Sequence, residues 1–403
     1  MTSLLLPSGT TLEKYTLRGA PRPLPSRRDA PRTRRAYAAA HVVADPLATV
    51  DPALDPAVDW DATLRFRHHL WDLGLGVAEA MDTAQRGMGL PHGLVRELIE
   101  RSCGEAVERG AAIACGAGTD DLPEDRPVTL AEIERSYLRQ CRWIEDAGGQ
   151  VVLMASRALC RTARSADDYL SVYGTVLGSL TRPAILHWLG DMFDPRLAGY
   201  WGTADLDTAA DTVVRLITEN ARSVDGIKIS LLDAGREVAL RRRLPAGTTM
   251  FTGDDFNYPE LIRGDEQGHS DALLGIFDAI APLAAEAFAL LDGGDAAGFD
   301  RVLAPTVPLS RAIFEAPTYH YKTGIVFLAY LRGLQSHFVM LGGHQGARSV
   351  GHLARLFRLA DRAGLIEDVD LAVARMRAVL ATAGIDGRDT VVAGSGTSAR
   401  SGT

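Results

Sequence analysis

The stretch V-D-G-I-K-I-S-L-L at residues 224–232 carries a single lysine inside a largely apolar run. It lacks the strict alternation of polar and apolar side chains that marks a strand with one solvated face. A continuous run of this kind is typical of a strand buried on both faces, as in a parallel sheet covered by helices. The stretch therefore predicts a buried parallel strand that holds Lys228 in apolar surroundings.

Similar apolar runs recur on both sides of this stretch, and amphipathic segments such as 90–110 and 129–148 follow them. The further runs are 36–44, 73–80, 111–118, 150–156, 183–190, 248–253 and 272–280. Eight strand–helix units within about 250 residues predict a closed (β/α)8 TIM barrel. An open doubly wound sheet is the competing fold, but it usually carries a glycine-rich loop after its first strand. Here H-V-V-A-D-P-L-A-T-V-D-P at 41–52 has no glycine.

The chain of 403 residues divides into four predicted parts. Residues 1–35, rich in Pro, Arg and Ser, are expected to form a partly flexible extension. The barrel should span 36–292, and residues 293–385 show helical patterns without a strand signal. Residues 386–403 have the composition of a flexible tail. The apolar C-terminal helices could supply a subunit interface, so a homodimer or homotetramer is expected.

Composition narrows the class of protein. The net charge is −8 and hydrophobic residues make up 46% of the chain, as in an ordinary soluble globular protein. No strongly basic surface points to nucleic acid, and no apolar run approaches the roughly 18 residues of a membrane span. The four cysteines form no C-x-x-C pair, and the N-terminus does not resemble a secretory signal. A cytoplasmic protein without a nucleic-acid or membrane partner is expected.

Lysine is rare in this sequence, and its positions are informative. Only Lys14, Lys228 and Lys322 are lysines, and the other 40 of the 43 basic residues are arginines. Arginine stays protonated, whereas a desolvated lysine amine can lose its proton and attack a carbonyl carbon. We therefore predict that Lys228 forms a Schiff base with a small carbonyl compound. The alternative is that Lys228 makes a buried ion pair with Glu79 or Asp254.

Several segments resemble the dihydrodipicolinate synthase / N-acetylneuraminate lyase family of class I aldolase-type barrels. V-D-G-I-K-I-S at 224–230 is similar to the family's segment that holds the Schiff-base lysine. F-T-G-D-D (251–255), C-G-A-G-T (115–119) and L-M-A-S-R (153–157) line up with its seventh, third and fourth strands, and A-P-T-Y-H-Y-K (316–322) with its N-P-x-x-x-K linker. The order and spacing match over roughly residues 37–335. The resemblance implies a barrel lyase of a divergent branch, with Lys228 as nucleophile and Lys322 as a structural lysine.

The departures from the family concern its substrate. The family's catalytic tyrosine aligns with Met154 or Ala155, so no tyrosine stands there. Its G-T-T-G-E loop, which holds a pyruvate carboxylate, is replaced by V-A-E-A-M-D-T-A-Q at 77–85. Glu79 and Asp82 in this segment would repel a carboxylate. Pyruvate is therefore not the expected substrate.

Polar residues at the carboxyl ends of the predicted strands are the candidate site residues, because barrel active sites form there. His187, on the strand beside Lys228, is the candidate proton shuttle, and a hydrogen-bonded core histidine is its alternative. Candidate substrate-binding residues are Glu79, Asp82, Thr83, Ser156, Trp188, Ser230 and Asp254. Acidic groups with an indole ring favour a keto-sugar or a related hydroxylated carbonyl compound, with no cofactor.

Two other functions stay open at this point. His41, Glu79, Asp82, His187 and Asp254 could together bind a divalent metal ion, because carboxylates and imidazole suit Mn or Zn. The barrel would then be a metal-dependent sugar isomerase, epimerase or aldolase. Alternatively, a barrel that has lost its catalytic tyrosine could serve as a non-catalytic carbohydrate-binding protein.

Overall fold

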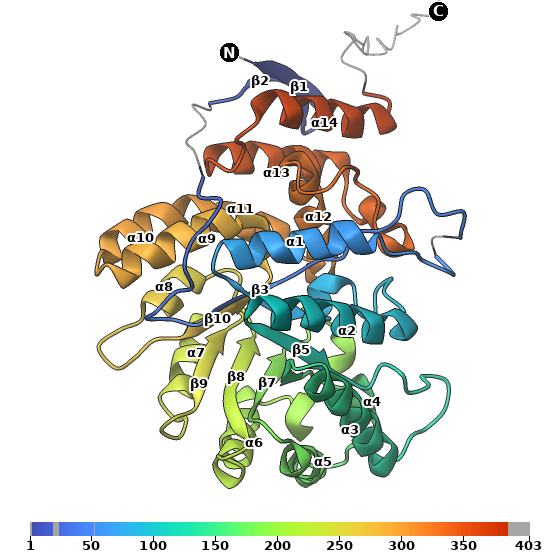
Figure 1. The fold of residues 1–403 in the computed structure, drawn as a ribbon, viewed down its shortest axis with the longest axis vertical. Coiled ribbons are helices and arrows are strands. Elements are labelled where there is room, and N and C mark those ends of the chain that lie inside the picture. The colour runs from blue at the N-terminus through green and yellow to red at the C-terminus, as the bar shows by residue number, and fades with distance from the viewer. Residues whose placement is uncertain (1, 19–23, 52, 386–403) are drawn as a thin grey trace, which may run out of the picture.

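A closed barrel of eight parallel strands forms the centre of the molecule (Figure 1). The computed structural model describes residues 2–18, 24–51 and 53–385. The barrel strands are β3 (Ala36–Ala39), β4 (Gly76–Glu79), β5 (Ile113–Ala117), β6 (Gln150–Leu153), β7 (Ala184–Leu189), β8 (Val224–Ser230), β9 (Thr249–Thr252) and β10 (Asp271–Leu274). Each strand pairs with the next, and β10 closes the barrel onto β3. The prediction of a (β/α)8 barrel is confirmed, and every predicted apolar run contains a strand.

Helices surround the barrel and connect its strands (Figure 1). They are α1 (Trp60–Asp72), α2 (His92–Arg109), α3 (Leu130–Asp146), α4 (Arg157–Thr162), α5 (Ala166–Ser179), α6 (Leu206–Glu219), α7 (Ala234–Arg241), α8 (Tyr258–Arg263) and α9 (Ile276–Asp292). Helix α3 begins with a capping box, in which Thr129 Oγ1 accepts from the Glu132 amide and Glu132 Oε2 accepts from the Thr129 amide.

Apolar side chains fill the inside of the barrel and leave its carboxyl end polar. The inner cluster consists of Tyr37, Ala39, Ala78, Met81, Ala114, Val152, Met154, Ile185, Phe251 and Leu273. In the strand register, Lys228 lies between His187 of β7 and Phe251 of β9. Directly paired residues on neighbouring strands point to the same face, so Lys228 and His187 point inward with Phe251. The barrel thus places the lysine above a dry layer of side chains.

The N-terminal extension contains an ordered hairpin. Strands β1 (Ser3–Ser8) and β2 (Thr11–Thr16) pair antiparallel and pack on the C-terminal helices α13 (Val350–Arg362) and α14 (Val369–Thr382) (Figure 1). Leu4 and Leu6 are buried there, and the Tyr15 hydroxyl donates to Asp361 Oδ2 at 2.6 Å. Hence part of 1–35, expected to be partly flexible, is held by apolar burial and hydrogen bonds. The predicted flexible tail, 386–403, lies outside the described residues.

The C-terminal region is helical, as predicted. Besides α13 and α14 it contains α10 (Ala296–Leu303), α11 (Val307–Ile313) and α12 (Tyr321–Leu331). All the side chains of α12 are buried, because this helix lies between the barrel helix α9 and the outer helices α13 and α14. Within the described part of the chain, no helix combines the length and apolarity that a bilayer crossing requires.

Candidate active site

Lys228 lies near the end of β8 with its amine free inside the barrel mouth. Its side chain is 7% exposed, and it makes no hydrogen bond or ion pair with any residue that the structure describes. Gly253, directly after β9, leaves the space that the side chain needs, because a Cβ at this position would lie 2.7 Å from Lys228 Cε. Neither Glu79 nor Asp254 pairs with the lysine, so the buried ion pair considered as the alternative does not form.

A small cavity of about 10 Å³ adjoins the amine. Its lining includes Asp82, Thr83, Ser230, Asp255 and Tyr321. Space of this size holds about one water molecule, which is close to the size of a carbonyl oxygen. A larger cavity of about 290 Å³ begins beside it, because Asp82 and Leu189 line both spaces. The larger cavity can therefore hold the rest of a small molecule whose carbonyl end reaches Lys228.

The electrostatics around Lys228 favour a reactive amine. Burial lowers the pKa of Lys228, and the negative charges of Asp255 and Asp82 partly oppose this shift. Burial also raises the pKa of Asp255 to about 7. The pair therefore combines an amine that loses its proton more readily than usual with a carboxyl group that can hold a proton near neutral pH.

The sequence selected the wrong one of two adjacent aspartates. Asp254 does not line the small cavity. Its carboxylate accepts hydrogen bonds from the amides of Phe256 and Asn257 and from the Asn257 side chain at 2.8–3.0 Å. Asp255 lines the cavity instead, with one carboxylate oxygen accepting from the Ile276 amide at 2.8 Å. Asp255, and not the predicted Asp254, is therefore the acidic residue after strand β9 that lines the Lys228 cavity.

His187 lies beside Lys228 but does not line its cavity. Its Nε2 is 3.3 Å from Ser230 Oγ, and its Nδ1 has no partner among the described residues. Burial, with a smaller contribution from the nearby Lys228 charge, lowers the pKa of His187 well below its usual value. The imidazole is therefore neutral near pH 7 and contacts the cavity through Ser230.

Glu79 does not face a substrate. Its two carboxylate oxygens accept from Arg67 Nε and Nη2 of helix α1 at 2.8 and 2.9 Å, and both side chains are fully buried. Glu79 Oε1 also accepts from the Ala80 amide at 2.8 Å, and Ala80 has a left-handed φ of 52°. The expected role of Glu79 in binding substrate is thus corrected: it shapes the turn that leads to Asp82 and Thr83.

Two further candidates also face away from the cavities. Trp188 follows the inward His187 on β7 and therefore points outward, where its ring packs edge-on against Trp201 at 6.3 Å between centroids. Ser156 caps α4 by accepting from the Leu159 amide at 2.9 Å and is hydrogen-bonded to Thr119 Oγ1 at 2.6 Å. Neither residue lines the cavities beside Lys228. Asp82, Thr83 and Ser230, in contrast, do line the small cavity.

The five candidate metal ligands do not form one site. His41 uses both ring nitrogens, one 2.8 Å from Asp278 Oδ2 and the other 3.0 Å from Gln335 Oε1. Glu79 is paired with Arg67, and Asp254 is bonded to its own loop. Across residues 2–18, 24–51 and 53–385, no three His, Cys, Asp or Glu side chains are grouped so that they could hold a metal ion.

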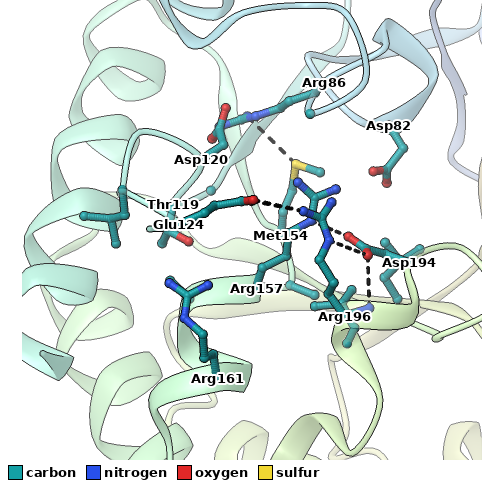
Figure 2. Close-up of a pocket in the computed structure, with 17 residues that line it drawn as sticks. Asp82, Arg86, Thr119, Asp120, Glu124, Met154, Arg157, Arg161, Asp194 and Arg196 are labelled. Atoms are coloured by element: carbon teal, nitrogen blue, oxygen red, sulfur yellow. Dashed lines mark hydrogen bonds and ion pairs between the residues drawn. The ribbon is translucent and has the colours of Figure 1, made fainter. Parts of the chain in front are cut away.

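The larger cavity is lined by charged side chains of both signs (Figure 2). These are Asp82, Arg86, Asp120, Glu124, Arg157, Arg161, Asp194 and Arg196. Most of them pair with one another: Arg86 with Asp120, Arg157 with Asp194, and Arg196 with Glu124 and Asp194. Arg161 bonds only to the Pro123 carbonyl, and the Asp82 carboxylate makes no bond within the described chain. The cavity thus offers several donors and acceptors to a polar molecule.

Tyr321 is a site residue that the sequence did not reveal. It begins α12, and its hydroxyl lies 2.8 Å from Thr83 Oγ1 at the small cavity. The resemblance of 316–322 to the family's linker implies a role for Lys322 and none for its neighbour Tyr321. The Lys322 amine donates to the Tyr319 carbonyl at 3.1 Å. Arg86, Arg161 and Arg196 of the larger cavity were likewise not predicted, because their convergence depends on tertiary structure.

Solved structures place this barrel among the dihydrodipicolinate synthase-like folds. Dihydrodipicolinate synthase from Aquifex aeolicus aligns with a TM-score of 0.63 at 13% identity, over 83% of this chain and 99% of that one. The enzymes from Thermotoga maritima and Bacteroides thetaiotaomicron both align with a TM-score of 0.61. Their identities are 14% and 15%, over 83% and 84% of this chain and 100% and 99% of theirs.

The sequence itself belongs to the family described as a protein of unknown function (DUF993), whose profile matches residues 4–385. No curated protein matches the chain. The family thus covers the hairpin, the barrel and the C-terminal helices together, and the structural neighbours establish the kind of barrel. At 13–15% identity they establish the fold alone.

Proposed function

We propose that this protein is a Schiff-base-forming lyase or aldolase that acts on a small hydroxylated carbonyl compound through Lys228. The observation that carries the proposal is the free, desolvated Lys228 amine beside a space of carbonyl size. A neutral amine adds to a carbonyl carbon, and the oxygen leaves as water with net uptake of one proton. The resulting iminium accepts the electron pair of the bond between its α and β carbons when the hydroxyl on the β carbon loses its proton, so that an enamine remains and the β carbon leaves as a carbonyl group.

The lining of the larger cavity supports a hydroxylated substrate such as a keto-sugar. Asp82 stands with a free carboxylate where the two cavities meet, and it can accept a hydrogen bond from a substrate hydroxyl. The same charge disfavours a carboxylate next to the carbonyl, as in pyruvate. Glu79 does not add to this negative charge, because Arg67 neutralises it. Ser230, which contacts His187, would position the bound carbonyl compound beside Lys228.

The test is reductive trapping, for which the chain is well suited. The full-length protein is incubated with dihydroxyacetone, with fructose or with pyruvate, treated with borohydride, digested and mapped by mass spectrometry. Since only three lysines exist, the adduct site is unambiguous. We expect an adduct on Lys228 with dihydroxyacetone or fructose, and a weaker one with pyruvate. Absence of any Lys228 adduct would contradict the proposal and would favour a non-catalytic carbohydrate-binding barrel, tested by calorimetry with the same sugars.

Removing the Asp255 charge should shift the pH dependence of adduct formation. The Asp255 carboxylate raises the pKa of Lys228, so Asp255→Asn should lower it further. The amine is then neutral at lower pH, and the midpoint of the initial trapping rate should move down by about one pH unit. Trapping with dihydroxyacetone between pH 6 and 10 measures the midpoint. Asp254→Asn removes an equal charge one residue away and should move it less; equal shifts would contradict the assignment of Asp255.

A further inference from the structure

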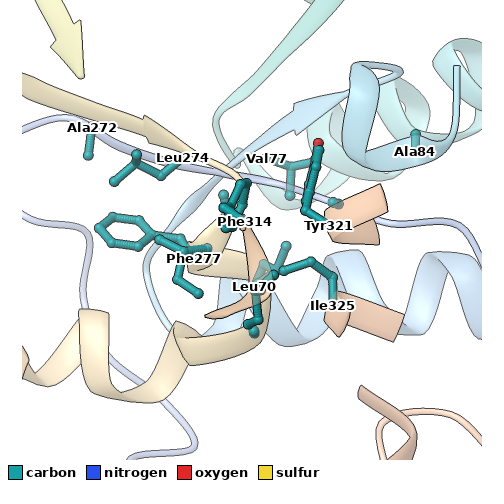
Figure 3. Packing of buried hydrophobic residues seen from close by; sticks show 14 of the residues in the cluster. Leu70, Val77, Ala84, Ala272, Leu274, Phe277, Phe314, Tyr321 and Ile325 are labelled. Carbon is teal, nitrogen blue, oxygen red and sulfur yellow. The ribbon is translucent and has the colours of Figure 1, made fainter. Parts of the chain in front are cut away.

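The first turn of helix α12 places a phenol at the Lys228 cavity. Tyr321 stacks on Phe314 with 4.4 Å between ring centroids and 15° between planes, and Phe193 packs edge-on at 6.2 Å. In Figure 3 the Tyr321 ring stands next to Phe314, and its hydroxyl points away from Leu70 and Ile325. These contacts fix the ring, so the position of the hydroxyl is set before any ligand binds.

Among the residues that the structure describes, the partner of the Tyr321 hydroxyl is Thr83, which follows strand β4. The two oxygens lie 2.8 Å apart, and both residues line the cavity that also contains Lys228 and Asp255. Burial, with smaller contributions from Asp82 and Asp255, raises the pKa of Tyr321 well above its usual value. The phenol therefore stays protonated and donates hydrogen bonds. The Lys322 amine, 4.7 Å from the ring centroid, adds a cation beside the ring.

Imine formation needs a proton donor that the lysine cannot itself supply, because Lys228 must be neutral to attack. His187 is a poor donor: it is neutral near pH 7 and does not line the cavity. Asp255 can hold a proton near neutral pH. Tyr321 brings a hydroxyl to the same cavity, as do Thr83 and Ser230. The Tyr321 phenol therefore borders the space that would hold an oxygen bound beside Lys228.

We infer that Tyr321, held by Thr83, is the catalytic residue that carries protons to and from the oxygen of the bound carbonyl compound; this inference rests on the proposed function. As the Lys228 nitrogen forms the C–N bond, the carbonyl π electrons move to oxygen, which takes the phenol proton. The phenolate then regains a proton from the carbinolamine nitrogen. In dehydration Tyr321 protonates the hydroxyl, the C–O bond breaks, the nitrogen lone pair forms C=N, and water leaves. Asp255 reprotonates the phenolate, so one proton is consumed overall.

This role gives the C-terminal helices a part in catalysis. Thr83 comes from the barrel, whereas Tyr321 comes from the region that follows it, so the site is complete only when α12 is docked. The sequence had suggested only a subunit interface for these helices. A barrel truncated before α12 would keep Lys228 and lose its proton carrier.

The experiment compares the rate and the final extent of imine formation with dihydroxyacetone as the probe, by borohydride quenching at timed intervals. Tyr321→Phe keeps the ring stack and removes the hydroxyl. We expect the initial rate to fall about 100-fold, a typical contribution of general acid–base catalysis. The final trapped fraction should equal that of the unaltered protein, because a proton carrier changes the rate and not the equilibrium. Thr83→Val should lower the rate less.

The control is Tyr330→Phe, which removes a hydroxyl from the same buried helix away from the cavity. It should leave both quantities unchanged. A Tyr321→Phe protein that traps at the unaltered rate would overturn the inference, and so would one in which rate and extent fall together, since that pattern reports a collapsed pocket. Failure of the unaltered protein to trap the probe on Lys228 is a different result, which contradicts the proposed function itself.

Discussion

Lys228→Met is expected to reduce adduct formation at residue 228 to background, a loss of at least about 1,000-fold, because the nucleophile is gone. Lys228→Arg should give the same loss, since a guanidinium keeps its charge and does not attack carbonyl carbons. Trapping with dihydroxyacetone and borohydride, followed by peptide mapping, measures the effect. Lys14→Met, on the surface hairpin, is the matched control and should trap normally.

Lys228→Met should not lower the free energy of unfolding. Burial lowers the pKa of Lys228 in the folded protein, so the charged amine destabilises the fold at pH values below that lowered pKa. This destabilisation decreases as the pH rises toward 10.5, the usual pKa of a lysine amine. Lys228→Met should therefore be at least as stable as the unaltered protein at pH 7, and its advantage should shrink at pH 10. Residual trapping at another lysine, or a collapse of the Lys228→Met fold, would contradict the assignment.

The barrel was predictable because each of its strands is buried on both faces and therefore has a continuous run of apolar residues. The buried position of Lys228 was predictable for a related reason, because the lysine lies inside such an apolar run. The alternation of side chains along β7 also predicts that His187 and Trp188 face opposite ways, so the outward position of Trp188 could have been inferred. At the end of β9 that regularity stops, and the choice between Asp254 and Asp255 depends on the loop that follows.

Residues that meet from distant parts of the chain were not predictable. Arg67 lies on α1 and Glu79 on β4, and nothing in their local sequence marks them as a pair. Tyr321 reaches Thr83 only because the first residue of α12 lies at the Lys228 cavity. Short-range patterns describe strands and helices, whereas pairing between elements depends on packing of the whole chain. Of the predicted site residues, the structure therefore brings Asp82, Thr83, Ser230 and Lys228 together at one cavity and holds Glu79 in an ion pair elsewhere.

Replacing Arg67 should have the largest effect on stability. Arg67 donates to both Glu79 oxygens, to the His41 carbonyl after β3 and to the Thr63 carbonyl of α1. Arg67→Met leaves the Glu79 charge buried without a partner, which costs about 3–5 kcal/mol. Chemical denaturation at pH 7 measures the loss. It should also slow trapping at Lys228, because Glu79 holds the Ala80 amide at the turn that leads to Asp82 and Thr83.

The double variant Arg67→Met/Glu79→Leu separates the two contributions. Removing both charges leaves no unpaired carboxylate, so much of the lost stability should return, as it does when a buried ion pair is replaced by apolar side chains. Trapping should stay slow, since without Glu79 the Ala80 amide has lost its acceptor. If the double variant were less stable than Arg67→Met, the unpaired charge would not be the cause of the loss. If it trapped at the unaltered rate, the Glu79 carboxylate would not be what places Asp82 and Thr83 beside the lysine.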